Sequence, residues 1–432
     1  MGQTVAIETI DGLRTSGLLI PRYEHADSEH IVLKLKSGYN IGVRASTITS
    51  IIPRDESNLK SGQIESQESA LAEEKSYSEA VARKKSKILL LSTGGTIASR
   101  VDYRTGAVHP ALSASDLYSA VPELDELAEI KPEVVFSVYS ENLGPEQWSI
   151  LAKRVAAESD SLDGIVITMG TDTLGFAAAA LSFALIGFKK TIVLTAAQRS
   201  SDRPSSDAAL NLKAAIVFAS NSGRPGVFVA MHDSESDDYI SIHSGVRVRK
   251  NHTSRRDAFQ SIDIPQVARV KGNEITFNEA IVNPPAHKSS KGSFALKTNF
   301  ESRVALVKFH PGFDPAVLRY LADSDRTRGI IVEGTGLGHV SSHTVEVIAD
   351  IVKKGEIFVG ITSQCIWGHV DLNVYDTGRD LLTAGAIPLG NMISETALAK
   401  LSWALANFSN PKHVMLENFL GEYTERILLN QS

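Results

Sequence analysis

Hydrophobic positions divide the chain into two regions with different patterns. In residues 1–54, five short runs rich in β-branched residues are separated by polar, turn-forming segments, a pattern typical of short strands. From residue 87 onward, continuous apolar runs such as KILLLST and GIVITMG alternate with longer segments of helical period such as PEQWSILAKRVAAES. Continuous apolar runs indicate strands buried on both faces, and their alternation with helices predicts a mostly parallel sheet.

This pattern predicts an α/β body of two domains that follows a small all-β barrel of the Sm or SH3 kind. The barrel should span residues 1–54, and the polar segment of mixed charge at 55–86 should be a linker. We expect a larger α/β domain at 87–290. A smaller α/β domain at 300–432 should contain the strands SRVALVKFHPG, RGIIVEGTG and EIFVGITSQ.

Composition narrows the class of protein. The 432 residues are 43% hydrophobic with a formal net charge of −6, which excludes disorder and argues against a general polyanion binder. The single cysteine, Cys365, excludes an intrachain disulfide and a cysteine-rich metal site, and we expect no bound metal. The N-terminus lacks a signal-peptide pattern and no apolar run approaches about 18 residues. We therefore expect a cytoplasmic protein without a membrane partner.

The charge balance of the barrel bears on nucleic-acid binding. Residues 1–54 hold six Lys or Arg and five Asp or Glu, which leaves the barrel almost neutral. Direct binding of nucleic-acid phosphates by the barrel alone would need a clustered excess of positive charge. Docking to another protein is at least as good an interpretation of this barrel as direct RNA binding.

Three polar loops follow buried runs and are the candidates for chemistry, because ligands of parallel sheets bind beyond the carboxyl ends of the strands. They are Thr93–Ser99 (TGGTIAS), Gly170–Thr173 (GTDT) and Arg249–Thr253 (RKNHT). Each also has an ordinary structural interpretation. The first loop can be an ordinary strand–helix turn, the second a helix N-cap and the third a basic surface turn. The residue types alone leave both interpretations open.

Taken together, TGGTIAS, ITMGTDT and the spacing between them resemble the bacterial-type asparaginase/glutaminase family. The resemblance extends over residues 87 to about 425 and includes EGTGLGH and SETALAKL. It implies that Thr96, Thr171, Asp172 and Lys250 are catalytic, with Thr96 attacking a side-chain amide. Which threonine attacks first stays open in the sequence, and Thr96 is favoured because it lies on the glycine-rich side.

The same resemblance implies the groups that bind the substrate. Ser140 should bind the substrate α-carboxylate, and Glu141 should bind the α-ammonium by direct charge pairing. Gly95 and Gly170 should line the site with backbone, and Tyr103 is the nearest candidate for the tyrosine of a lid.

The first 86 residues, together with SQCIWGHVDLNVYDTGRDLLTAGAIP, resemble one branch of that family more closely. This branch consists of the D subunits of archaeal glutamyl-tRNA(Gln) amidotransferases. The resemblance implies that the chain frees ammonia from glutamine or asparagine and carries no cofactor itself. A partner, the E subunit of the amidotransferase, would use ATP and Mg²⁺ to convert Glu-tRNA(Gln) to Gln-tRNA(Gln), and would make most of the tRNA contacts.

The branch also implies a homodimer of this chain within a heterotetramer. The alternative is a free-standing L-asparaginase with an extra N-terminal domain. Other enzyme classes have no support, because the sequence contains no P-loop, no GxSxG elbow and no HExxH pair. We interpret Gly334-x-Gly336-x-Gly338 as a turn at a strand end, and His339 and His343 as structural or interfacial residues.

Overall fold

The structure of the chain is a computed structural model. It describes residues 4–19, 29–35, 40–53, 85–94, 99–101, 108–110, 124–157, 162–199, 205–281, 296–323, 327–355 and 357–424. The predicted linker up to residue 84, and the predicted site residues Gly95, Thr96 and Tyr103, lie outside these described residues.

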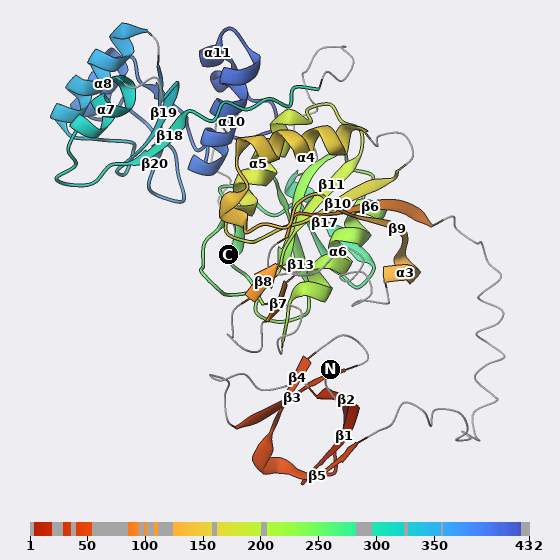
Figure 1. The fold of residues 1–432 in the computed structure, drawn as a ribbon. Coiled ribbons are helices and arrows are strands. Elements are labelled where there is room, and N and C mark those ends of the chain that lie inside the picture. Colours follow the sequence, from red (N-terminus) through yellow and green to blue (C-terminus); the bar gives the residue numbers. More distant parts are fainter. Residues whose placement is uncertain are drawn as a thin grey trace.

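The five predicted N-terminal strands form one antiparallel sheet in the order β4-β3-β2-β1-β5. Val5, Ile7 and Leu33 form its buried centre, and Figure 1 shows the strands curving around it. The strands are β1 (Thr4–Thr9), β2 (Arg14–Leu19), β3 (His30–Lys34), β4 (Asn40–Arg44) and β5 (Ile48–Pro53), with a 3₁₀ turn at Ala45–Thr47.

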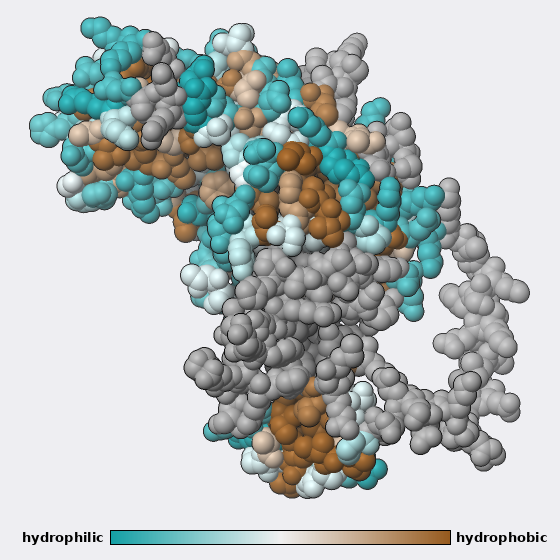
Figure 2. All heavy atoms as spheres, in the orientation of Figure 1, coloured by the Kyte–Doolittle hydropathy of each residue, from teal (hydrophilic) through white to brown (hydrophobic). Residues whose placement is uncertain are grey.

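Hydrophobic side chains reach the surface of this barrel, which lies at the bottom of Figure 2, where they appear as brown spheres. The large exposed ones in the described part of the barrel are Ile10, Leu13, Ile51 and Ile52. One of its basic side chains, Arg14, is paired with Glu8 at 3.1 Å. These four hydrophobic side chains give the described part of the barrel an exposed apolar surface.

The larger α/β domain is built on an eight-stranded sheet in the order β17-β16-β13-β12-β11-β10-β6-β9. The five strands from β9 to β12 along this order are parallel, which confirms the predicted mostly parallel sheet, and the other three add an antiparallel edge. The strands are β6 (Ser86–Ser92), β9 (Ala128–Val134), β10 (Gly164–Thr168), β11 (Thr191–Thr195), β12 (Gly226–His232), β13 (Ile240–Ser244), β16 (Ala268–Lys271) and β17 (Glu274–Phe277).

Helices cover both faces of this sheet (Figure 1). Leu89 and Leu91 of β6 face the core beneath α4 (Pro145–Ala157) and α5 (Leu174–Ala184). The alternate residues Ile88 and Leu90 face α3 (Leu124–Leu127) and α6 (Ala208–Asn221). Side chains of a strand alternate between faces, so a strand covered on both sides must be apolar throughout.

The larger domain also contains two short antiparallel pairs of strands. They are β7 (Ser99–Val101) with β8 (Val108–Pro110), and β14 (Val248–Lys250) with β15 (Phe259–Ser261). A 3₁₀ turn lies at Glu279–Ile281.

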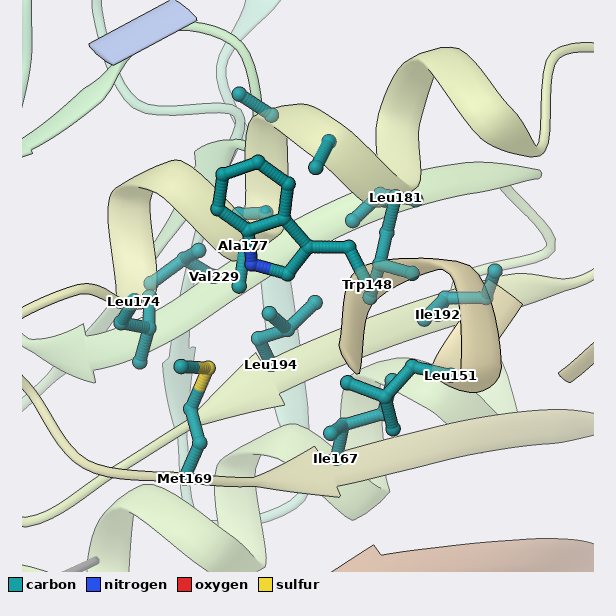
Figure 3. Close-up of a cluster of buried hydrophobic side chains, with 14 of the residues drawn as sticks. Trp148, Leu151, Ile167, Met169, Leu174, Ala177, Leu181, Ile192, Leu194 and Val229 are labelled. Carbon is teal, nitrogen blue, oxygen red and sulfur yellow. The ribbon is translucent and has the colours of Figure 1, made fainter. Parts of the chain in front are cut away.

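The core under α4 and α5 supports the end of strand β10. Figure 3 shows the Trp148 ring of α4 among Leu174, Leu181 and Leu194, with Met169 at the edge of the same cluster. Met169 directly follows β10 and precedes the polar loop that starts at Gly170. Because interiors are close-packed, this cluster holds the start of that loop in one place.

The smaller domain has four parallel strands in the order β18-β19-β20-β21. Helix α10 joins the two domains, since its Trp403 ring stacks on Phe183 of α5 with ring centroids 5.6 Å apart. The elements are β18 (Val304–Lys308), α7 (Ala316–Asp323), β19 (Gly329–Gly334), α8 (Ser342–Lys354), β20 (Phe358–Ser363), α9 (Asp376–Thr383), β21 (Ile387–Pro388), α10 (Ser394–Asn407) and α11 (Pro411–Leu416).

The glycine series at 334–338 forms a turn, as predicted. Strand β19 ends at Gly334, and Thr335 and His339 pair across the turn. A Cβ on Gly334 would collide with the backbone of Gly338, so the turn requires glycine there. In the described ranges, no helix is both long enough and apolar enough to cross a bilayer.

A buried histidine should make stability depend on pH. His243 of β13 contacts Ser261 Oγ through Nδ1 at 2.8 Å, and burial lowers its pKa to about 4, against the opposing effect of Asp233. The unfolded pKa is about 6.5, so between these values the unfolded chain binds the extra proton. The contribution of His243 to the free energy of unfolding is therefore fully present above about pH 6.5 and is lost as the pH falls to about 4. This pH-dependent contribution is about 3 kcal/mol. We expect the free energy of unfolding to fall less steeply from pH 7 to 4.5 in His243→Gln than in wild type, and equal slopes would contradict this.

Candidate active site

The site lies where the sheet changes direction. Strands β6 and β10 are parallel neighbours, and the chain after β6 continues to β9 on one side, whereas the chain after β10 continues to β11 on the other. Such a switch point opens a crevice beyond the carboxyl ends of the two strands. The loops that begin at Thr93 and Gly170 both start there.

The first loop is held close to the segment that follows β9. The Thr93 amide and hydroxyl donate to the carbonyl of Thr168 at 3.0 and 3.1 Å, which ties the loop to β10. Gly94 has a φ of 100°, and a Cβ there would lie 2.5 Å from the carbonyl oxygen of Val138. Only glycine fits this backbone, since an L-residue would be both strained and in collision.

The second loop and the basic loop meet. Lys250 Nζ donates to Thr171 Oγ1 at 2.8 Å and to Asp172 Oδ1 at 2.7 Å. Helix α5 takes Thr173 as its N-cap residue, and that side chain does not cap the helix. The capping interpretation of Thr171 and Asp172 is therefore wrong, because both side chains accept from the ammonium instead.

Lys250 is not part of a free surface turn either. It ends β14, whose Val248 is buried in the core beneath α5, and its own side chain is only 14% exposed. Asp172 is 71% exposed, so the ion pair faces the crevice rather than the protein interior. A hydroxyl, a carboxylate and an ammonium in direct contact can orient a nucleophile and transfer protons.

The segment with the predicted substrate-binding residues completes this edge. Ser140 starts a 3₁₀ turn at Ser140–Asn142, is buried, and accepts at its carbonyl from Thr173 Oγ1 at 2.6 Å. Glu141 is exposed, with its Oε2 3.5 Å from Ser140 Oγ. A Cβ on Gly170 would lie 2.7 Å from Ser140 Cβ, so glycine is required for the two loops to approach.

The structure thus brings Ser140, Gly170, Thr171, Asp172 and Lys250 together, although they come from three separated segments. The predicted residues Gly95, Thr96 and Tyr103 lie outside the described part of the chain. No group of three or more His, Cys, Asp or Glu side chains that could hold a metal occurs among the described residues.

Two contacts at the site escaped the sequence interpretation. Thr173 looked like a capping residue but ties the Ser140 segment to the second loop. Arg249, beside Lys250, pairs with Glu395 at the start of α10 at 3.2 Å. The pKa of Glu395 is raised overall, because the effect of burial is larger than the opposing effect of the nearby Arg249. No local pattern indicates a pair whose members are so far apart in the chain.

Comparison with protein families assigns three parts of the chain. Residues 87–283 match the asparaginase N-terminal domain, residues 303–415 the glutaminase/asparaginase C-terminal domain, and residues 1–52 the GatD N-terminal domain. The D subunit of the glutamyl-tRNA(Gln) amidotransferase from Sulfurisphaera tokodaii is 43% identical, over 96% of this chain and 90% of that protein. The one from Saccharolobus solfataricus is 42% identical, over 99% and 94%.

Two similar solved structures each cover less than four fifths of the chain. The thermostable L-asparaginase from Thermococcus kodakarensis is 35% identical with a TM-score of 0.69, and it covers 79% of this chain and 100% of its own. A probable cytoplasmic L-asparaginase from Campylobacter jejuni is 29% identical with a TM-score of 0.65, over 77% and 98%. These two asparaginases are therefore matched almost in full while about a fifth of this chain stays unmatched.

Proposed function

Because this chain belongs to the GatD branch of the asparaginase family, the D subunits of glutamyl-tRNA(Gln) amidotransferases, we propose that it releases ammonia from glutamine or asparagine for a tRNA-bound acceptor. It is an asparaginase-type amidotransferase subunit. The ammonia would pass to a partner, the E subunit, that amidates Glu-tRNA(Gln) in the cytoplasm. ATP and Mg²⁺ would bind to that partner.

One observation carries the choice between this function and a free-standing L-asparaginase. The amidotransferase subunits align with 96% and 99% of the chain, whereas the two solved asparaginases align with 79% and 77%. The GatD N-terminal domain at residues 1–52 lies outside the two asparaginase domains, which match residues 87–283 and 303–415. An accessory domain is expected where the product must be delivered to a partner.

The chemistry we propose is a two-step acyl transfer. Thr96 Oγ attacks the side-chain amide carbon, and a C–O bond forms as the carbonyl becomes an oxyanion. The C–N bond then breaks, and the amide nitrogen takes up the proton that the Thr96 hydroxyl gave up and leaves as ammonia. Water then hydrolyses the acyl-threonine and returns a proton to Thr96 Oγ. Backbone N–H groups near Gly95 and Thr171 would stabilise the oxyanion, each with a contribution of about 3 kcal/mol.

The contacts of Lys250 support the proton-transfer part of this proposal. Its ammonium touches both Thr171 Oγ1 and Asp172 Oδ1, so a proton can move along the three groups without rearrangement. Ser140 and Glu141 lie beside Gly170, where they could bind the α-carboxylate and the α-ammonium of the substrate. Tyr103 would close the site as a lid residue.

The test is ammonia release by the full-length chain, measured with L-glutamine and with L-asparagine. We expect slow release by the chain alone and at least about tenfold faster release when the E subunit, ATP, Mg²⁺ and Glu-tRNA(Gln) are all present. Uncharged tRNA(Gln) in place of Glu-tRNA(Gln) is the matched control and should leave release slow. Full activity of the chain alone, unchanged by the partner, would contradict the amidotransferase function and favour the free-standing asparaginase.

The assembly can be tested in the same preparation. We propose a homodimer of this chain within a heterotetramer that contains two copies of the E subunit. Light scattering of the mixed subunits should then give the mass of two copies of each chain. A one-to-one complex would contradict this stoichiometry without affecting the ammonia assay.

A further inference from the structure

The hairpin that carries Lys250 also reaches the smaller domain. Lys250 of β14 pairs with Phe259 of β15 at one end, and the carbonyl of Arg247 accepts from the amide of Ile262 at 2.8 Å at the other. The distance from Arg247 to Lys250 is three residues, or about 10 Å along a strand. The hairpin therefore spans the space between the crevice and the domain junction.

Alternate residues of this strand face opposite ways. Val248 packs in the core beneath α5, and Lys250 points to the second loop. Arg247 and Arg249 contact the smaller domain instead. Arg247 Nη1 donates to the carbonyls of Asn391 and Glu422 at 2.8 and 2.9 Å, and Arg249 Nε lies 3.2 Å from Glu395 Oε1.

Arg247 is a fully buried cation, with a relative exposure of 0%. Loss of water around the guanidinium lowers its pKa to about 10, so it stays charged at neutral pH. Its nearest carboxylate is Asp263 Oδ2, 3.8 Å from Nη2. Burying a cation is costly unless its contacts are kept, so the hairpin and the smaller domain are held to one arrangement.

Asp263 fixes the same junction from the end of β15. It follows the hairpin with a positive φ of 58° and is buried. Its Oδ1 accepts from the Gly368 amide at 3.2 Å, and its Oδ2 accepts from Asn391 Nδ2 at 3.0 Å. One carboxylate thus binds two loops of the smaller domain and lies beside Arg247.

We propose that Arg247 and Asp263 are positioning residues for Lys250, so that the alignment of the lysine depends on how the smaller domain is docked. This rests on the proposed function, in which Lys250 takes part in proton transfer. Neither residue touches Thr171 or Asp172 in the structure, so both act through the hairpin. The substrate-binding candidates Ser140 and Glu141 lie on another element, so their geometry does not depend on this junction.

The proposal predicts a fall in kcat with little change in KM. Asp263→Asn is the sharpest variant, because asparagine tolerates a positive φ and keeps an acceptor for the Gly368 amide. It removes the charge beside Arg247 and weakens the contact with Asn391. Since misplacing a reacting group by about 1 Å can cost about 100-fold, we expect kcat for ammonia release to fall about 10- to 100-fold, with KM within about twofold.

Asp233→Asn is the matched control. Asp233 also pairs with an arginine, Arg269 at 3.2 Å, but its side-chain partners Arg269 and Ser241 both lie in the large sheet and outside the hairpin. We expect it to leave kcat unchanged even if its melting temperature falls as far as that of Asp263→Asn. A second variant, Arg247→Lys, keeps a cation at the junction and should fold, yet it cannot reproduce the guanidinium contacts, so its kcat should fall as well.

A double-mutant cycle separates this proposal from the proposed function. If Asp263 acts through Lys250, adding Asp263→Asn to Lys250→Met should lower the residual kcat by less than about twofold. Wild-type kcat in both folded junction variants, with Lys250→Met inactive, would overturn the positioning role and leave the proposed function intact. An additive loss in the double variant would also overturn it. Full activity of Lys250→Met would overturn both the positioning role and the part of Lys250 in proton transfer, while the response of ammonia release to the E subunit and Glu-tRNA(Gln) would still test the proposed function.

Discussion

Replacing Lys250 with methionine should lower kcat/KM for ammonia release by about 10²- to 10⁴-fold, the usual contribution of a positioned proton-transfer group. Methionine keeps much of the length of the side chain but has no donor for Thr171 Oγ1 at 2.8 Å or Asp172 Oδ1 at 2.7 Å. The steady-state rate of ammonia release from glutamine and asparagine, in the presence of the E subunit and Glu-tRNA(Gln), measures the effect.

The fold should survive this change. Asp172 is 71% exposed, so water replaces the lost ammonium and no buried charge remains. The melting temperature of Lys250→Met should therefore stay within a few degrees of wild type. A variant that melts normally and keeps its activity would show that Lys250 has no part in the reaction.

Thr96→Ala is the companion variant, since it removes the proposed nucleophile. Residues that act as one unit lose their effect together, so the double variant should be little slower than the slower single variant. Multiplied losses would instead show that Thr96 and Lys250 serve independent steps.

Replacing Lys400 with methionine should have the largest effect on stability. Lys400 of α10 and Glu422 are both 0% exposed, and their Nζ and Oε1 atoms lie 2.6 Å apart. The ammonium also donates to the carbonyls of Met415 and Glu417, which joins α10 to the end of α11. Removing one member of a buried pair leaves the other charge uncompensated and costs about 3 to 5 kcal/mol. Chemical denaturation at pH 7 measures this loss.

The physical cause can be checked with a second change. Lys400→Met combined with Glu422→Gln has no uncompensated charge, and the glutamine oxygen can still accept from the Leu420 amide that Glu422 binds at 2.7 Å. The double variant should therefore be more stable than Lys400→Met. Lys354→Met breaks a pair with Asp323 at 2.8 Å in which both side chains are 61% exposed, and it should change stability by less than about 1 kcal/mol. An equal loss in these two single variants would refute the role of burial.

The local pattern of hydrophobic residues was enough to predict most of the strands and the class of fold. The apolar run KILLLST became β6, with every residue from Leu89 to Ser92 buried, and GIVITMG became the fully buried strand β10. The short β-branched runs of residues 1–54 became the strands of an antiparallel sheet. These features follow from periodicity, because the side chains of a strand or helix face fixed directions once the element forms. The polar loops at strand ends were visible for the same reason.

Local pattern could not decide what those loops do. Thr171 and Asp172 suited a helix cap, and Lys250 suited a basic surface turn, until the fold placed the ammonium on both side chains. Lys250 is 79 residues from Thr171 along the chain, so their contact depends on where a separate hairpin packs against α5.

The sequence by itself therefore determined the elements, the class of fold and, through its motifs, the family. Only the tertiary structure decided which polar groups touch one another. It placed Arg247 and Asp263 in a buried link between the Lys250 hairpin and the smaller domain. The reason is physical. Periodicity reports the direction of a side chain from its own backbone, whereas the cost of burying a charge depends on partners that the packing of distant segments supplies.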